Sequence, residues 1–281
     1  MTDTSKRDRA RASVQAAGGV HQSEIVIPSL ILMQGQSPQL KDEGTNARVG
    51  GFYHPLLNKD FGRTLRVVIL RKRMTHELWG DRDSKQGLLA VADENGRWDK
   101  PNHEFEVPYS DGTVIYKTKR NLAESGLSDF GSWKPRTMSK RPATALCYRM
   151  LFWLPDHPRE SPVAVTLRRM PAVMFQKECI SRWLIRGEMG ELSWEQVFKL
   201  TTVNAVGGGQ TYISLSCMND GAIDDPELSE KLERLTILYS DANVIHAGEK
   251  EDQYEAEVEA GEREQRNQRR NYNRDADTRD F

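Results

Sequence analysis

Short segments rich in β-branched and aromatic residues, each bounded by a turn sequence, constrain the fold of this chain most strongly. The clearest is Thr-Leu-Arg-Val-Val-Ile-Leu-Arg-Lys-Arg at residues 64–73, which follows a glycine. Residues 88–92 and 113–118 are shorter strand candidates, separated by Asp-Glu-Asn-Gly at 93–96 and Ser-Asp-Gly at 110–112. Such spacing predicts an antiparallel sheet with tight connections.

Two hairpins and two helices follow in the second half of the chain. Residues 143–154 and 162–169 predict one hairpin, and residues 196–204 and 211–218 predict a second around three glycines. Between them, apolar residues at helical spacing predict a helix over residues 172–186. Residues 226–241 predict a last helix, with Asp225 as its N-cap. The pattern favours a β-rich, mainly antiparallel, barrel-like fold with an inserted helix and a C-terminal helix.

The two ends of the chain differ from its middle in composition. Residues 1–22 are polar, small and basic, and residues 249–281 are charged with few apolar side chains. Neither end buries enough apolar surface to offset its ordering entropy. We therefore expect a disordered basic arm (1–22), a single β-rich domain (23–248) and a disordered charged tail (249–281).

Several classes of protein are disfavoured by what the sequence lacks. No run of 18 apolar residues and no secretory signal is present, which predicts a cytoplasmic protein without membrane contact. The three cysteines and six histidines are scattered, so neither a disulfide framework nor a metal site is expected. Common nucleotide-binding and hydrolase motifs are missing as well. We expect no enzyme activity, no metal and no cofactor.

Aromatic residues interleaved with cations are the most distinctive functional pattern. Cations can follow the phosphates of a single strand while flat side chains stack on its unpaired bases. An aromatic residue in a β-rich protein is also commonly a core residue; Trp153, Trp183 and Trp194, in apolar or helical segments, are expected in the core. The best-placed aromatics are Trp98, Tyr116 and Trp133. The complete set of candidates is Arg71, Lys72, Arg73, Trp79, Trp98, Tyr116, Lys117, Lys119, Arg120, Trp133, Lys134, Arg136, Lys140 and Arg141.

Charge is unevenly distributed along the chain. The formal net charge is −1, but residues 249–281 contain 7 Lys/Arg and 11 Asp/Glu, so the remainder carries a net charge of +3. Residues 60–200 alone carry 24 Lys/Arg against 18 Asp/Glu. A basic body with an acidic tail suggests nucleic acid as a partner, with the tail competing for a basic groove.

The tail ends in Asp275, Asp277, Asp280 and Phe281. This terminus resembles the acidic C-terminal tip of bacterial and phage single-stranded DNA-binding proteins, in which a final aromatic residue docks on partner proteins. It departs from that pattern at Arg279 and in the Arg-rich block before it. The alternative is a solvating tail with an accidental terminal Phe.

The body resembles phage-encoded single-stranded DNA-binding proteins of the OB-fold type. The resemblance rests on Ile-Pro-Ser-Leu-Ile-Leu-Met-Gln at 27–34, Gly-Gly-Phe-Tyr at 50–53, and the passages 163–186 and 198–215. It implies an OB-like barrel that binds single-stranded DNA without sequence preference in phage replication or recombination, with a tail that recruits proteins of those processes. The alternative is a structural or protein-interaction component of phage assembly. A homo-oligomer is compatible with either function.

Overall fold

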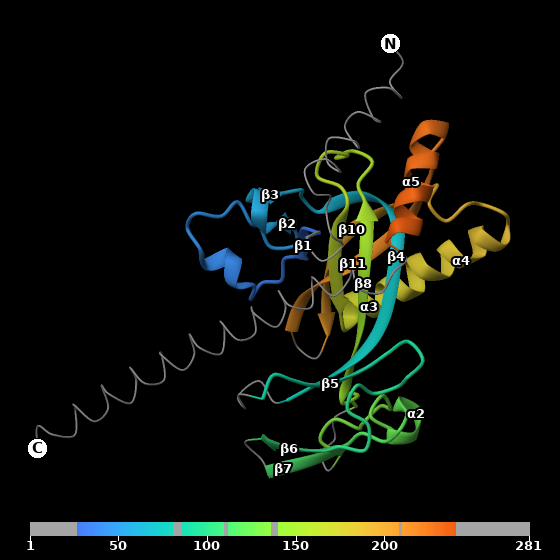
Figure 1. The fold of residues 1–281 in the computed structure, drawn as a ribbon. Helices are drawn as coiled ribbons and strands as arrows, with labels where there is room; N and C mark the ends of the chain where they lie inside the picture. The colour runs from blue at the N-terminus through green and yellow to red at the C-terminus, as the bar shows by residue number, and fades with distance from the viewer. Residues whose placement is uncertain (1–26, 81–85, 110–111, 136–139, 208–209, 240–281) are drawn as a thin grey trace, which may run out of the picture.

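The computed structural model describes residues 27–80, 86–109, 112–135, 140–207 and 210–239. The expected arm (1–22) and tail (249–281) lie outside these residues. The described part is β-rich with few helices (Figure 1). None of its helices is both long and apolar enough to cross a membrane.

Nine strands of the described residues form one sheet, ordered β11-β10-β4-β8-β9-β1-β2-β3, with β5 also paired to β4. All pairs are antiparallel except β1 with β9. The sheet curls into a half-barrel (Figure 1). The strands are β1 (Ser29–Leu32), β2 (Phe52–His54), β3 (Lys59–Asp60), β4 (Thr64–Trp79), β5 (Leu88–Ala92), β8 (Thr144–Trp153), β9 (Val163–Arg168), β10 (Gln196–Gly207) and β11 (Gln210–Ala222).

Four of these strands follow a Greek-key order. In chain order β4, β8, β9 and β10 are first to fourth, and in space they lie as β10-β4-β8-β9. β11 pairs with β10 as a hairpin. The connection from β9 to β10 is the inserted helix, built from α3 (Met170–Phe175), a π-helical turn (Gln176–Ile180) and α4 (Ser181–Glu188).

The main core fills the inside of the curled sheet. Leu65, Val67 and Ile69 alternate along β4 toward it, while Val68 points to the other face. Phe175 of α3 is fully buried against the same core. Each such side chain stabilises the fold by roughly 1.5–3 kcal/mol. Residues 64–73 therefore form a strand that is covered on both faces, by the main core on one side and by the outer cluster on the other.

Side chains cover the outer edge of β11, the last strand of the sheet. Gln34, just after β1, donates from Nε2 to the carbonyl of Ile213 (3.2 Å), and its Oε1 accepts from the amide of Ile213 (3.1 Å). Glu178 Oε2 accepts from the amide of Cys217 (2.8 Å), and Arg182 donates to its carbonyl (2.7 Å). These groups occupy backbone positions to which another chain could otherwise add a strand.

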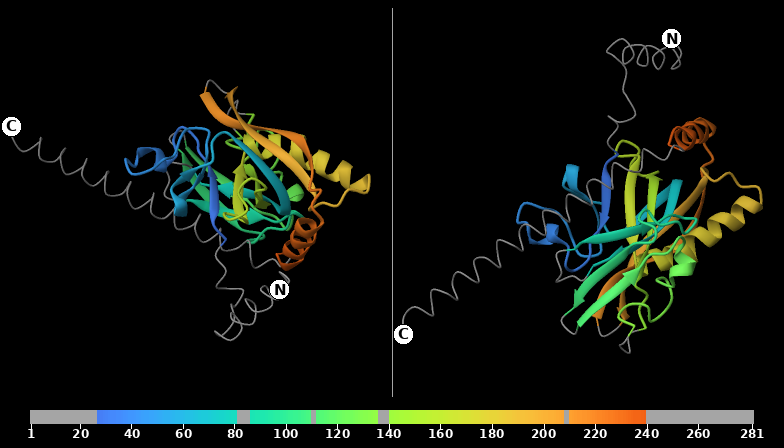
Figure 2. Two further views of the ribbon diagram at one scale, coloured as in Figure 1. Left: turned by 90° about the horizontal axis from the view of Figure 1, so that it is seen from above. Right: turned by 60° about the horizontal axis from the view of Figure 1, so that its bottom comes forward.

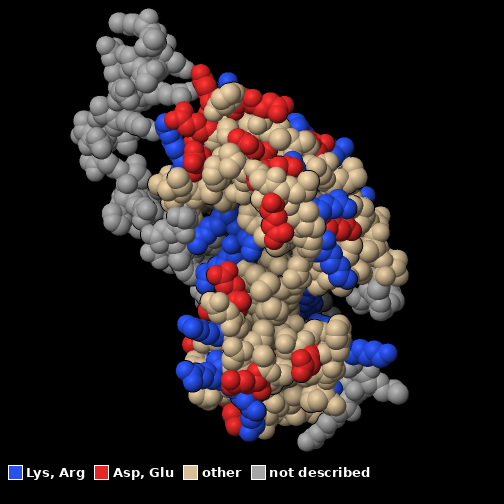
Figure 3. Space-filling model, turned by 90° about the vertical axis from the view of Figure 1, so that its right-hand side faces the viewer, with Lys and Arg blue, Asp and Glu red and all other residues tan. Residues whose placement is uncertain are grey.

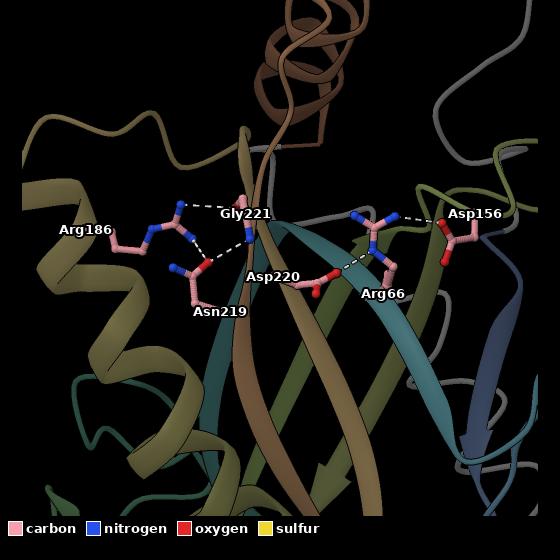
Figure 4. A network of polar contacts seen from close by, with 6 residues as sticks. All are labelled: Arg66, Asp156, Arg186, Asn219, Asp220 and Gly221. Atoms are coloured by element: carbon pink, nitrogen blue, oxygen red, sulfur yellow. Dashed lines mark hydrogen bonds and ion pairs between the residues drawn. The ribbon is translucent and has the colours of Figure 1, made fainter.

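The end of β11 is held from two sides (Figure 4). Arg66 of β4 contacts Asp220 (2.5 Å) and Asp156 in the β8–β9 loop (2.9 Å). Arg186 of α4 donates to the side chain of Asn219 (2.6 Å) and to the carbonyl of Gly221 (3.1 Å). This network joins the inserted helix, the β10–β11 hairpin, β4 and the β8–β9 loop.

A small lobe, formed by the described part of residues 86–143, lies between β4 and β8 in the chain. It contains β5, β6 (Glu104–Tyr109), β7 (Gly112–Lys117) and the short α2 (Leu122–Ser125). Its side chains form a separate apolar cluster around Leu89, Val107 and Leu127. The lobe lies at one end of β4, away from α5 (Figure 1).

α5 (Pro226–Leu238) packs on the outer face of the sheet. Asp225 caps it, since its Oδ1 accepts from the amides of Glu227 (3.0 Å) and Leu228 (3.4 Å). Leu232 is fully buried against Val68 and other residues of that face. Two 3-10 turns, Pro38–Lys41 and Pro55–Leu57, complete the described helical segments. The segment with β1–β3 lies on the opposite side of the molecule from α4 (Figure 2).

Candidate nucleic-acid interface

The long strand β4 distributes its basic run over both faces of the sheet. A register shift between Ile69 and Arg71 marks a bulge. Beyond it, Arg71 pairs with Leu151 of the outer cluster, and Lys72 pairs with Met150 of the inner core. Paired residues share a face, so Arg71 and Arg73 point outward while Lys72 points the other way. The sequence analysis placed all three cations in one candidate nucleic-acid site. In the structure, Lys72 lies on the opposite face of the sheet from Arg71 and Arg73.

Two further arginines lie on the outer side of the neighbouring strands. Arg149 of β8 stands directly opposite Arg73, and Arg168 of β9 is paired with Cys147. We call Arg71, Arg73, Arg149 and Arg168 the outer arginine face. Like charges in directly opposed positions destabilise a sheet. Another group must therefore compensate them.

Glu77 of β4 supplies that compensation. Its carboxylate is fully buried, yet it accepts from Arg149 Nη2 (3.1 Å), Arg168 Nε (2.9 Å) and Trp79 Nε1 (3.1 Å). The Arg168 guanidinium also lies 5.8 Å from the centre of the Trp79 ring. A buried carboxylate is tolerated when it is paired and hydrogen-bonded in this way. Glu77 thus fixes the orientation of side chains from three strands.

The thiol of Cys147 lies beside the same carboxylate. Burial, followed by the negative charge of Glu77, raises the pKa of Cys147 to about 12. The thiol therefore stays protonated at neutral pH, and it gives the outer arginine face no nucleophile. Within the described residues, no three His, Cys, Asp or Glu side chains are grouped to hold a metal ion.

The arginines differ in their access to solvent. The side chain of Arg168 is 31% exposed and that of Arg149 only 7%. Arg71 and Arg73 are half-buried, and Arg71 donates to the carbonyl of Tyr239, just after α5. Arg149 is therefore buried against Glu77, whereas Arg71, Arg73 and Arg168 are partly exposed.

The outer arginine face lies between α5 and the small lobe, because Arg71 contacts Tyr239 and Trp79 ends β4 where the lobe begins. A hollow with gathered Lys and Arg side chains separates the upper body from the lower lobe in Figure 3.

Two of the aromatic candidates are core residues, which corrects the sequence-based prediction. Trp98 is 5% exposed and Tyr116 is 2% exposed, both within the apolar cluster of the small lobe. The Tyr116 hydroxyl lies 3.0 Å from that of Tyr109. Proximity to turns suggested exposed rings, but the lobe has a core of its own that these rings fill. Neither ring face is available for stacking on a base.

Trp133 is half-buried, and cations already lie over its ring. The Cζ atom of Arg141 is 4.7 Å and the Nζ atom of Lys134 5.0 Å from the ring centre. Tyr109 packs edge-on against the same ring at 5.8 Å. Trp133 is therefore part of an aromatic and cationic group on the lobe surface.

The other lobe cations are exposed, and some candidates fall outside the described residues. Lys117 forms an ion pair with Glu104 (2.5 Å). The neighbouring carboxylate weakens the attraction of Lys117 for a phosphate. Lys119, Arg120, Lys140 and Arg141 are exposed. The candidates outside the described residues are Arg136, Asp275, Asp277, Asp280 and Phe281.

Sequence reasoning missed Glu77, Arg149 and Arg168. A signal was present for Arg149, which interrupts the apolar strand Cys-Tyr-Arg-Met-Leu-Phe-Trp at residues 147–153. A charged residue in a strand covered on both faces requires a partner and so marks a polar site. Glu77 and Arg168 carry no such local signal, since strand ends are commonly polar.

Comparison with known proteins places the chain in a phage family. The family model described as Pam3 phage gp34-like protein matches residues 5–244. The chain belongs to this family. The match covers the arginines, the small lobe and α5, so the Pam3 gp34-like region includes the whole described structure. No curated protein and no solved structure matches the chain.

Proposed function

We propose that this Pam3 gp34-like protein binds single-stranded DNA without sequence preference during phage DNA replication or recombination. The observation that carries the proposal is the outer arginine face, where Arg71, Arg73 and Arg168 of one curled sheet are partly exposed and Arg149 is buried against Glu77. The protein acts in the host cytoplasm by binding, without an enzymatic step. Guanidinium groups suit phosphate oxygens because they donate two hydrogen bonds in a fixed geometry.

The strand arrangement supports an OB-like barrel. An OB-fold is a five-stranded Greek-key barrel that binds oligonucleotides on the face of its second and third strands and on the loops between strands 1–2 and 4–5. Here β4, β8, β9, β10 and β11 would be the five strands, with the inserted helix between the third and fourth. Arg149 and Arg168 then lie on the second and third strands, and the small lobe is the loop between the first and second.

The mixture of cations and aromatics on the small lobe fits the same ligand. Arg141 and Lys134 lie against Trp133, and the exposed Lys119 and Arg120 lie on the same lobe. Affinity for a single strand comes from phosphate neutralisation and base stacking, neither of which reads sequence. The proposal therefore predicts strong salt dependence and little sequence preference.

The acidic tail has a regulatory role in this proposal. It carries a net charge of −4 and would compete with DNA for the outer arginine face while it recruits partner proteins. Deleting residues 249–281 should tighten binding to oligo(dT) about fivefold at low salt, because repulsion of the phosphates is removed. Quenching of tryptophan fluorescence by oligo(dT), reversed by high salt, measures the affinity of both proteins.

A structural role in phage assembly is the second candidate. Apolar side chains on and after α4 favour it, since Leu184, Ile185 and Met189 are 54%, 57% and 75% exposed. An assembly protein that uses this surface does not need to bind DNA. Oligo(dT) would then leave the tryptophan fluorescence unchanged both in the full-length protein and in the tail deletion. Absence of quenching by oligo(dT) at low salt in the full-length protein would favour assembly over DNA binding.

A further inference from the structure

Phe130 is the most exposed of the large apolar side chains found exposed in the described residues, at 89%. It lies in the small lobe between α2 and β8. A single exposed apolar residue is common on protein surfaces. Its ordered loop and the cations of the same lobe distinguish this one.

The loop that carries Phe130 is held by hydrogen bonds on both sides of the residue. The amide of Asp129 donates to Gly126 (3.1 Å), and the amide of Gly131 donates to Arg141 (3.1 Å). The Ser132 hydroxyl donates to the carbonyls of Leu127 (2.9 Å) and Asp129 (2.7 Å). The ring is thus presented on an ordered loop, which reduces the entropic cost of using it to bind a ligand.

Phe130 follows the exposed Asp129, and the backbone of a cationic segment, Lys140 and Arg141, lies against the other side of its loop. Gly131 and Trp133 both donate backbone hydrogen bonds to the carbonyl of Arg141, at 3.1 and 3.0 Å. Arg141 and Lys140 are exposed, and Lys134 lies over Trp133. A base on the Phe130 ring would therefore have cations near its phosphate. Stacking on an aromatic side chain suits every base and requires that the base be unpaired.

The loop is also tied to the strand that carries Arg149. The amide of Thr144 at the start of β8 donates to the carbonyl of Leu127 (3.1 Å). Arg149 follows five positions along β8, or roughly 17 Å at 3.3–3.4 Å per residue. The ordered loop is thus joined to the same strand that carries Arg149 of the outer arginine face.

We propose that Phe130 is the base-stacking residue that makes this protein prefer single-stranded over duplex DNA. The inference rests on the proposed DNA binding and assigns a specificity determinant that is separate from the phosphate contacts. Duplex DNA keeps its bases paired and stacked, so it cannot use the ring.

The test compares four full-length proteins by anisotropy with fluorescein-labelled oligo(dT): wild type, Phe130→Ala, Phe130→Tyr and the control Leu56→Ala. Leu56 is 69% exposed and lies outside the lobe. Phe130→Ala should weaken oligo(dT) binding about tenfold, equivalent to about 1.4 kcal/mol. The slope of affinity against salt should not change, because every cation is retained. Phe130→Tyr and Leu56→Ala should bind as wild type does.

An abasic oligonucleotide of the same length separates stacking from other effects. Wild type should bind it more weakly than oligo(dT), and Phe130→Ala should bind both equally. If Phe130→Ala binds oligo(dT) as tightly as wild type, the stacking role is wrong and the proposed function stands. If wild type itself does not bind oligo(dT) at low salt, the proposed function fails first.

Discussion

Replacing Glu77 by Ala should lower the free energy of unfolding by about 3–5 kcal/mol. The carboxylate is fully buried and accepts hydrogen bonds from Arg149, Arg168 and Trp79. Its removal leaves the buried Arg149 guanidinium, already opposite Arg73, without its compensating charge. Breaking a buried ion pair from one side costs far more than the pair contributes net, because a charge remains buried.

The matched control is Glu230→Ala. Glu230 forms an ion pair with Arg234 one turn along α5, and both side chains are about 60% exposed (61% and 59%). Loss of such a pair costs roughly 0.3–0.5 kcal/mol. Urea denaturation followed by tryptophan fluorescence measures both variants. A cost below about 1 kcal/mol for Glu77→Ala would show that Glu77 does not hold the outer arginine face together.

Replacing both Arg71 and Arg73 by Gln should weaken single-stranded DNA binding by about tenfold or more at moderate salt. Each guanidinium can give a phosphate a charge-assisted hydrogen bond, of roughly 1.5–3 kcal/mol. The slope of log affinity against log salt concentration should also become less steep by about 1.4. Each phosphate neutralised on a single strand contributes about 0.7 to this slope, and the two arginines would neutralise two phosphates. Anisotropy titrations at several salt concentrations measure both quantities.

A control of equal charge is Lys41→Gln combined with Lys177→Gln. Both lysines are exposed and lie outside the outer arginine face, one in the 3-10 turn Pro38–Lys41 and one in the inserted helix. This pair should leave the salt slope nearly unchanged. An equal loss of affinity in both double variants would mean that net charge alone attracts DNA, and the outer arginine face would lose its role.

Local patterns were sufficient to predict much of the sheet. Residues 88–92 form β5 as predicted, and the two predicted hairpins are β8–β9 and β10–β11. Alternating side chains and turn residues specify these elements within a few positions of one another. The inserted helix, α5 and its Asp225 cap were also predicted, since helical periodicity and capping are local properties.

Features that local patterns could not predict depend on interactions between distant segments. The strand predicted at 64–73 continues to Trp79, and its bulge near Leu70 sets which cations share a face. Trp98 and Tyr116 fill a core that exists only when the small lobe closes on itself. Arg168 and Glu77, 91 positions apart, meet because β8 pairs with both of their strands. The residue pattern within a single segment cannot predict which distant segments pair with one another.

If the outer arginine face binds the phosphates of a single strand and the small lobe stacks on its unpaired bases, the full-length protein should prefer a single strand to a duplex. A gel-shift titration of the full-length protein with one DNA sequence, as a single strand and as a duplex, tests it most directly. We expect tighter binding of the single strand, with an affinity that falls steeply as salt rises. No shift at low salt, or equal shifts for the single strand and the duplex, would contradict this expectation.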